Sequence, residues 1–297
     1  MRKVLMAFCL LFSGPVLADG QPVSMWLVEG EANRVYMLGS VHLLRRQDHP
    51  LPQIMEEAYQ DAEALIMELD MDDLDPAALQ AATNRMGLLD AGVTLEDVIG
   101  EEAWATALAA AEEIRIPLDM MSQSEPWLAA ITIEQLILMR LGFNPLYGIE
   151  LHMTTQAIAD GKPITGLETA EEQLGFFDNM SVEAQTDLLM QTLTERQDSE
   201  QFMDQMVAAW RRGDVDYLEE TMLAEMEDFE ELYATIVVDR NRRWVDEIVE
   251  LLDDPDDYLI VVGALHMVGD DGVPTLLAQR GIEVEQMQDS SPEGTVE

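Results

Sequence analysis

One pattern occurs twice in this chain: a short apolar run that ends in Gly-x-x-His. The first copy runs from Val35 to His42, and the second runs from Tyr258 to His266. A continuous apolar run of this length, rich in β-branched residues, is typical of a strand covered on both faces. Such strands belong mostly to parallel sheets, in which functional groups collect beyond the strand C-termini. The pattern therefore predicts an α/β fold in which both ends of the chain share one sheet.

The two histidines at the ends of these runs are the first candidates for function. A single histidine after a strand is usually a hydrogen-bonded structural residue, but the chain has only four histidines and two share this context. Neutral imidazole is the commonest metal ligand in proteins. Gly39 and Gly263 allow a bulge, a positive φ or a close backbone approach at the strand ends. We therefore predict that His42 and His266 meet at one metal site.

Two further strands are predicted to bring carboxylates to the same edge of the sheet. Glu68 lies at the end of the apolar run Ala64–Leu69, and Glu168 follows the run Ile164–Leu167. A helix over Leu51–Ala62 would link the first motif strand to Ala64–Leu69 in a β-α-β unit. That unit predicts that its two strands are parallel neighbours.

The rest of the chain is mostly helical in pattern. Helical periodicity fills residues 76–142 and 181–252, with a break near Gly213. We expect a single domain over residues 19–288, with a central, mainly parallel sheet made from the N- and C-terminal segments. The helical stretches form a large insertion between those segments, and residues 289–297 form a flexible tail.

The first residues have the composition of a secretory signal. Arg2 and Lys3 precede the apolar stretch Val4–Phe12, and Val16–Ala18 resembles a cleavage site. The apolar stretch is too short to span a membrane, and no second stretch is long enough. The sequence predicts cleavage after Ala18, a periplasmic or secreted protein, and no membrane span after cleavage.

Composition narrows the chemistry. The only cysteine, Cys9, lies in the predicted signal, so the mature chain is expected to have neither disulfides nor thiol chemistry. The formal net charge is −43, which should repel nucleic acid and anionic lipid. We therefore expect no nucleic-acid partner, and we interpret most acidic residues as solvated surface.

Two histidines with one or two carboxylates suit a divalent transition metal that keeps a position open for water. Such an ion would lower the pKa of the water and polarise a carbonyl group. Glu68 is the preferred ligand or base, while Glu168 and Glu150 are weaker candidates. Arg240 lies within an apolar helical pattern, where it would either form an ordinary ion pair or orient a carboxylate at the metal. The other two histidines, His49 and His152, are not expected at the site.

Several segments together resemble the TraB/GumN family in order and spacing. They are Tyr36–Leu43, Glu68, Pro126–Trp127, Gly166–Thr169 with Gln173, Arg240–Asn241, Val262–Gly272, and Gly281 before Ile282–Val284. The resemblance covers about residues 24–287, and its specific part is the pair of Gly-x-x-His motifs. The family is similar to the Tiki metalloproteases and, more distantly, to the erythromycin esterase and ChaN-like group. Where the family often has aspartate, this chain has Glu150.

This resemblance implies catalytic roles for His42, Glu68 and His266, and a divalent metal such as manganese or cobalt, with zinc also compatible with the ligands. We predict a periplasmic metal-dependent hydrolase of the peptidase or amidase type, with Arg240 in the catalytic group and Glu168 as a further metal ligand. One alternative is a non-catalytic protein that binds a peptide, and another is a carrier of metal or haem. The sequence identifies neither the peptide or small-molecule substrate nor the oligomeric state.

Overall fold

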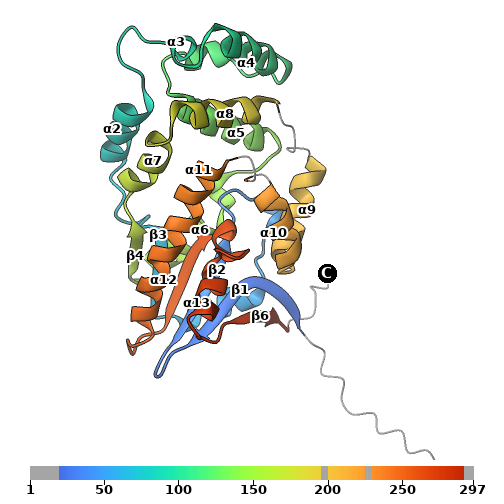
Figure 1. Ribbon diagram of the computed structural model, residues 1–297. Coiled ribbons are helices and arrows are strands. Elements are labelled where there is room, and N and C mark those ends of the chain that lie inside the picture. Colours follow the sequence, from blue (N-terminus) through green and yellow to red (C-terminus); the bar gives the residue numbers. More distant parts are fainter. Residues whose placement is uncertain (1–19, 195–199, 225, 227–228, 291–297) are drawn as a thin grey trace, which may run out of the picture.

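The computed structural model describes residues 20–194, 200–224, 226 and 229–290 (Figure 1). The predicted signal, residues 1–18, lies outside this part of the chain. So does most of the predicted tail, although Asp289 belongs to the last strand. In the described part of the chain, no helix combines the length and the apolar character that crossing a bilayer requires.

The core of the fold is a six-stranded sheet with the strand order β4-β3-β5-β2-β1-β6 (Figure 1). Its strands are β1 (Gln21–Glu29), β2 (Arg34–Ser40), β3 (Ala64–Leu69), β4 (Ile164–Glu168), β5 (Tyr258–Gly263) and β6 (Glu285–Asp289). The four strands β4, β3, β5 and β2 are mutually parallel, and β1 is antiparallel to both of its neighbours. The predicted α/β class, with a mainly parallel sheet drawn from both chain ends, is confirmed.

One sequence expectation about strand order is wrong. The strands β2 and β3 are parallel, but they are not neighbours, because β5 lies between them and pairs with both. The strand β5 can bury its apolar side chains only in the interior of the sheet, and its residues Leu259, Ile260, Val261 and Val262 are all buried. The second histidine motif is thereby placed directly beside the first.

Alternating side chains of the central strands fill two separate cores, one on each face of the sheet. From β2, Tyr36 and Leu38 join one core, while Val35 and Met37 join the other. The period of two residues is the one that a pleated strand imposes on its side chains. Both faces of the sheet are therefore covered, as the apolar runs predicted.

Helices from distant parts of the chain cover these two faces. Residues of α1 (Gln53–Asp61), α6 (Ile149–Asp160), α9 (Glu200–Arg211) and α10 (Val215–Ala224) pack into the first core. Residues of α12 (Asp239–Leu251) and α13 (Val273–Gln279) pack into the second core. The predicted break near Gly213 is confirmed, since this glycine separates α9 from α10 and has a φ of 58°.

A further group of helices packs above the sheet, at the top of Figure 1. It contains α2 (Pro76–Gly87), α3 (Leu95–Ile99), α4 (Glu101–Glu113), α5 (Pro126–Arg140), α7 (Ala170–Asp178) and α8 (Val182–Thr194). Side chains of α3, α4, α5 and α8 form a core of their own. The helix α3 starts at Thr94 with a capping box formed with Asp97. The number of domains and the domain bounds of residues 19–288 stay predictions.

Short helical turns complete the chain. They are η1 (Arg46–Asp48), η2 (Leu118–Met121), η3 (Pro145–Tyr147), α11 (Glu230–Tyr233), η4 (Ala234–Val238) and η5 (Ala264–Met267). The turn η4 is a π-helix that runs directly into α12, and η5 carries His266. Single π-helical turns inside longer helices occur frequently at functional sites.

The helix α9 is fixed to the sheet edge by one buried tryptophan. The indole Nε1 of Trp210 donates a hydrogen bond of 2.6 Å to the carbonyl oxygen of Gly39, and the hydroxyl of Ser24 donates one of 2.8 Å to the carbonyl of Trp210. The Trp210 side chain is buried. This contact holds the strand end that leads into the first histidine motif.

We expect Trp210→Phe to lower the free energy of unfolding by about 1–3 kcal/mol beyond the loss of packing, because the Gly39 carbonyl would stay buried without a donor. Urea unfolding measures the change. Trp244→Phe is the matched control, since Trp244 is equally buried but its Nε1 has no hydrogen-bond partner within the described residues. Equal destabilisation by both substitutions would contradict the role of the hydrogen bond.

Candidate functional site

The C-terminal ends of the four parallel strands bring the predicted site residues to one edge of the sheet. The register places Ser40 of β2 opposite Gly263 of β5, and Leu69 of β3 opposite Glu168 of β4. His42 follows Ser40 by two residues, and His266 lies in the turn directly after Gly263. Parallel strands all end at the same side of a sheet, so these side chains come from distant sequence positions but one location.

A cavity of about 530 Å³ opens above this edge. Its polar lining includes His42, Glu68, Gln173, Arg240 and His266. The rest of its lining is mostly aromatic and aliphatic and comes largely from helices. A concave, mainly apolar cavity with a few converging polar groups is the usual form of a small-molecule or substrate site.

Both motif glycines lie in close contact with their neighbours, and neither has a positive φ. A Cβ atom on Gly39 would lie 3.2 Å from Cα of Ala264. A Cβ atom on Gly263 would lie 3.3 Å from Oε1 of Glu68, 3.6 Å from Cδ2 of His266 and 3.8 Å from Nε2 of His42. The two imidazoles and the Glu68 carboxylate therefore surround one point above Gly263.

His266 is held in one orientation inside the protein. Its Nδ1 lies 2.7 Å from Oδ1 of Asn241, and its ring centre lies 4.5 Å from that of Trp244. Burial lowers the pKa of His266 to about 3, more strongly than the Glu68 carboxylate raises it. The ring is neutral at physiological pH. With Asn241 accepting the Nδ1 proton, Nε2 keeps its lone pair and faces Nη1 of Arg240 at 3.1 Å.

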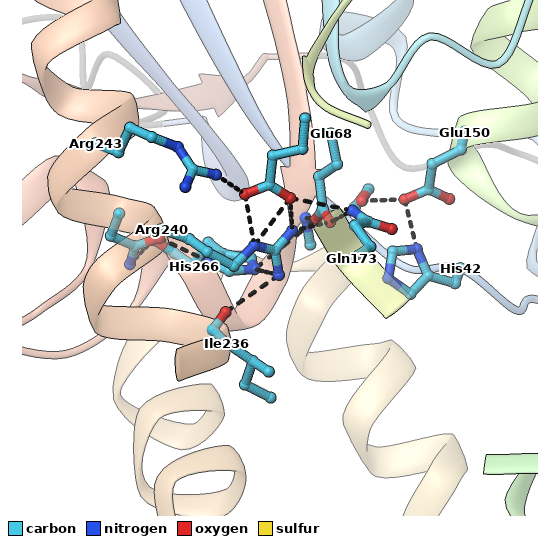
Figure 2. Close-up of polar contacts among 12 residues, drawn as sticks. His42, Glu68, Glu150, Gln173, Ile236, Arg240, Arg243 and His266 are labelled. Atoms are coloured by element: carbon cyan, nitrogen blue, oxygen red, sulfur yellow. Dashed lines mark hydrogen bonds and ion pairs between the residues drawn. The ribbon is translucent and has the colours of Figure 1, made fainter. Parts of the chain in front are cut away.

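His42 also has Nδ1 bonded to an oxygen, here that of a charged partner, but its side chain is 61% exposed. Its Nδ1 lies 2.8 Å from Oε1 of Glu150, and the hydroxyl of Ser40 donates to the same oxygen (Figure 2). The Glu150 carboxylate raises the pKa of His42 to about 9. His42 in turn lowers the pKa of Glu150, against the opposing effect of burial. Glu150 thus orients His42 so that Nε2 points to the same space as His266.

Glu68 is ionised in this setting. Burial would raise the pKa of Glu68, but the charges of Arg240 and His42 and the backbone N–H of Gly263 help lower it to about 2. The backbone N–H of Gly263 donates a hydrogen bond of 2.7 Å to Oε1, and the Gln173 amide donates one of 3.0 Å to Oε2. Oε1 also lies 3.9 Å from Nε2 of His266.

Arg240 connects the carboxylates to His266. Its Nη2 lies 2.5 Å from Oε2 of Glu68, its Nε donates to both oxygens of Glu168 at 3.0 and 3.1 Å, and its Nη1 lies 3.1 Å from Nε2 of His266 (Figure 2). A further bond runs from Nη1 to the carbonyl of Ile236 in the π-helical turn, at 3.1 Å. The two carboxylates raise the pKa of Arg240 although burial opposes them.

Glu168 is placed behind this arginine and not in the cavity lining. Its side chain is fully buried, and both of its oxygens are engaged by Arg240, with a further ion pair to Arg243. The structure therefore gives Glu168 contacts that suit the positioning of Arg240. His42, Glu68, His266 and Arg240 lie together as the sequence predicted, with Glu168 one step further away.

The two remaining histidines lie in a different place. Nε2 of His49 is 2.8 Å from the carbonyl of Tyr147, and Nε2 of His152 is 2.9 Å from Oε1 of Glu56. Their ring centres are 5.4 Å apart. Neither histidine lines the cavity, in agreement with the expectation from the sequence that they lie away from the site.

Glu150 and Asn241 contribute more than their sequence positions indicated. Each bonds Nδ1 of one histidine, but each lies on a helix remote in sequence from its partner. A signal was available for Asn241, because it follows Arg240 in a segment that resembles the family.

Some features of the site oppose a bound metal ion and others favour one. Within the described residues, no three His, Cys, Asp or Glu side chains already form a metal-holding group. The guanidinium of Arg240 lies next to the Nε2 of His266 that such an ion would use. The donors themselves suit a divalent ion, because both rings have Nδ1 bonded to an oxygen. Nε2 of His42 lies 3.8 Å from the point above Gly263, and Nε2 of His266 lies 3.9 Å from Oε1 of Glu68.

The fold and site define a class: an α/β protein with paired strand-end histidines and a carboxylate under one cavity. The chain belongs to the TraB/PrgY/gumN family, whose pattern it matches over residues 24–286. It is 26% identical over 242 residues to the uncharacterized protein YbaP of Escherichia coli strain K12, covering 82% of this chain and 87% of that protein. YbaP of Shigella flexneri matches equally. No solved structure matches.

In the metal-free protein, Glu150→Gln should lower the pKa of His42 from about 9 towards the ordinary value of about 6.5. The folded protein binds this proton more tightly than the unfolded chain does. The stabilisation from this pair is therefore present below about pH 6.5 and is lost as the pH rises through about 9. An NMR titration of the His42 ring in the presence of a chelator measures the pKa.

Glu56→Gln is the control for this titration, because Glu56 contacts His152 and not His42. It should leave the His42 titration where it is. A parent protein in which His42 titrates near 6.5 would show that Glu150 does not hold it as described.

Proposed function

We propose that this protein is a metal-dependent hydrolase of the peptidase or amidase type. The observation that supports it is the meeting of His42, His266 and Glu68 around one point above Gly263, at the floor of the cavity. Nε2 of His42, Nε2 of His266 and a Glu68 oxygen would hold the ion. Two imidazoles and a carboxylate suit zinc, cobalt or manganese with a position open for water.

When bound, a divalent ion lowers the pKa of a water molecule and polarises a carbonyl group. Hydrolysis then needs no oxidant or reductant: the water oxygen bonds to the carbonyl carbon, the C–N bond breaks, and the nitrogen leaves with a proton. Glu68 is a weak base because its pKa is about 2, so it suits the role of ligand better than that of proton acceptor.

Arg240 would contribute positive charge where the reaction needs it. Its guanidinium is fixed by Glu168 on one side and by the Ile236 carbonyl on another, and it faces the space between Glu68 and His266. A fixed cation at this place stabilises the negative charge that develops on a carbonyl oxygen. A metal ion and Arg240 would compete for Nε2 of His266, so metal binding requires that the Arg240 guanidinium give up its contact with that nitrogen.

Export is part of the same proposal. The charged start at Arg2 and Lys3 and the apolar stretch after it support a periplasmic or secreted location, although they lie outside the described residues. The charge of −43 supports a substrate other than nucleic acid. The substrate is then a peptide or small molecule of the envelope or the medium.

The purified protein should bind one zinc, cobalt or manganese ion per chain and cleave members of a peptide library only with that ion. His266→Ala should abolish tight metal binding and lower the cleavage rate by at least about 100-fold. Removal of a residue that only supports a metal ligand typically costs about 10–100-fold, and loss of the ligand itself should cost no less. Isothermal titration calorimetry and metal analysis measure the binding, and mass spectrometry of the library measures cleavage.

His152→Ala is the matched control, since its ring contacts Glu56 away from the cavity. It should bind and cleave like the parent protein. If the parent protein binds no divalent ion when the ion is supplied at micromolar concentration, the proposal is contradicted.

Asn241→Ala should weaken metal binding by about 10–100-fold, because Nδ1 of His266 would lose the acceptor that fixes its proton and its orientation. Asn84→Ala on the exposed face of α2 serves as the control, since its only described contact is with Gln80. Circular dichroism of both variants checks the fold. An unchanged affinity in Asn241→Ala would mean that His266 does not bind the ion.

A non-catalytic binding protein is the second candidate. It is favoured by Arg240, which already neutralises Glu68 and contacts His266 without a metal. In that case alanine at His42 or Glu68 would leave peptide binding unchanged, and no metal would promote cleavage of any library member.

A further inference from the structure

The cavity continues well beyond its polar floor, and that part is built from aromatic and thioether side chains. They are Phe176, Phe177, Phe202, Met203, Met206, Met222 and Met226. Methionine is flexible and polarisable, and it adapts to differently shaped apolar partners. A wall of this composition suits a bulky apolar ligand whose shape varies.

One face of α9 runs the length of this wall. Phe202, Met206 and Trp210 follow each other at four-residue spacing, and all three line the cavity. Trp210 is bonded to Gly39, next to the first histidine motif. Phe202 lies two helical turns away, about 12 Å along the axis, so the apolar part extends about that far from the strand edge.

The volume exceeds what one side chain fills. A dry cavity of about 150 Å³ accommodates a benzene ring, whereas this cavity has about 530 Å³. Roughly three ring-sized groups fit, which leaves space for two large side chains together with the amide to be cleaved. An alanine-rich peptide would leave most of the apolar wall without contacts.

The net charge of the protein disfavours apolar ligands that carry negative charge. With a net charge of −43, the protein repels fatty acids, anionic phospholipids and acidic peptides. The cavity lining also includes Glu134. Neutral and basic ligands are not repelled in this way.

We infer that the substrate is a neutral or basic peptide with two adjacent large apolar side chains, which occupy the Phe- and Met-lined part of the cavity. This inference rests on the proposed hydrolase function for the cleavage itself. The apolar wall and the net charge support the class of ligand independently of whether the ligand is cleaved.

The experiment uses the full mature chain and four blocked hexapeptides that differ only in two adjacent central positions: Leu-Leu, Phe-Phe, Ala-Ala and Glu-Glu. Binding is measured in a chelator through the fluorescence of tryptophan, since Trp210 lines the cavity. Cleavage is measured separately with the metal added. Leu-Leu and Phe-Phe peptides should bind at least about tenfold more tightly than Ala-Ala, and Glu-Glu should not bind.

Met203→Gln tests the wall away from the polar floor. Glutamine keeps the length and the helix propensity of methionine but buries an amide, which should reduce the preference for Leu-Leu over Ala-Ala by roughly tenfold. Met120→Gln is the control, because Met120 is 80% exposed and does not line the cavity. It should keep the full preference.

The outcomes separate the two proposals. Tight binding of apolar peptides without cleavage would overturn the hydrolase and leave the ligand class standing. Metal-dependent cleavage that treats all four peptides alike would overturn the ligand class and leave the hydrolase standing. A neutral dodecanoyl amide that binds while the apolar peptides do not would also overturn the ligand class, in favour of an acyl chain.

Discussion

The pairing of β5 between β2 and β3 is the constraint on which the site depends. This strand is apolar along its whole length, so it is stable only where both edges and both faces are covered. Its register sets Gly263 opposite Ser40 and next to Glu68 of β3, which brings both histidine motifs and one carboxylate to a single point. Residues from the two ends of the chain thereby form one site.

Buried charge is the second determinant, and Arg240 controls it. Two carboxylates beneath a largely apolar cavity would be costly if they were unpaired, and removal of one partner from a buried ion pair typically costs about 3–5 kcal/mol. The guanidinium bonds Glu68 and Glu168 together and contacts His266. The π-helical turn before α12 supplies the Ile236 carbonyl that fixes it. A cation is therefore built into the site, and a metal ion would share the same ligands.

Much of this could be predicted from the sequence, because the strong signals were local. Apolar runs ending in glycine gave the motif strands, and the positions of Glu68 and Glu168 at strand ends gave the correct sheet edge. The strand order could not be obtained, since periodicity says that a strand is buried but not which strands lie beside it. Glu150 was undervalued for a related reason: its partner His42 is remote in sequence and becomes a neighbour only when α6 packs on the sheet.

The most direct test of the account is the position of a bound ion. Crystals of the mature protein grown with zinc should give one strong anomalous peak at the zinc edge, within about 2 Å of Nε2 of both His42 and His266 and of a Glu68 oxygen. The Arg240 side chain should then no longer contact Nε2 of His266. A peak that contacts only one of the two histidines, or a zinc site elsewhere with Arg240 still bonded to Glu68, would contradict the shared site on which the proposed function rests.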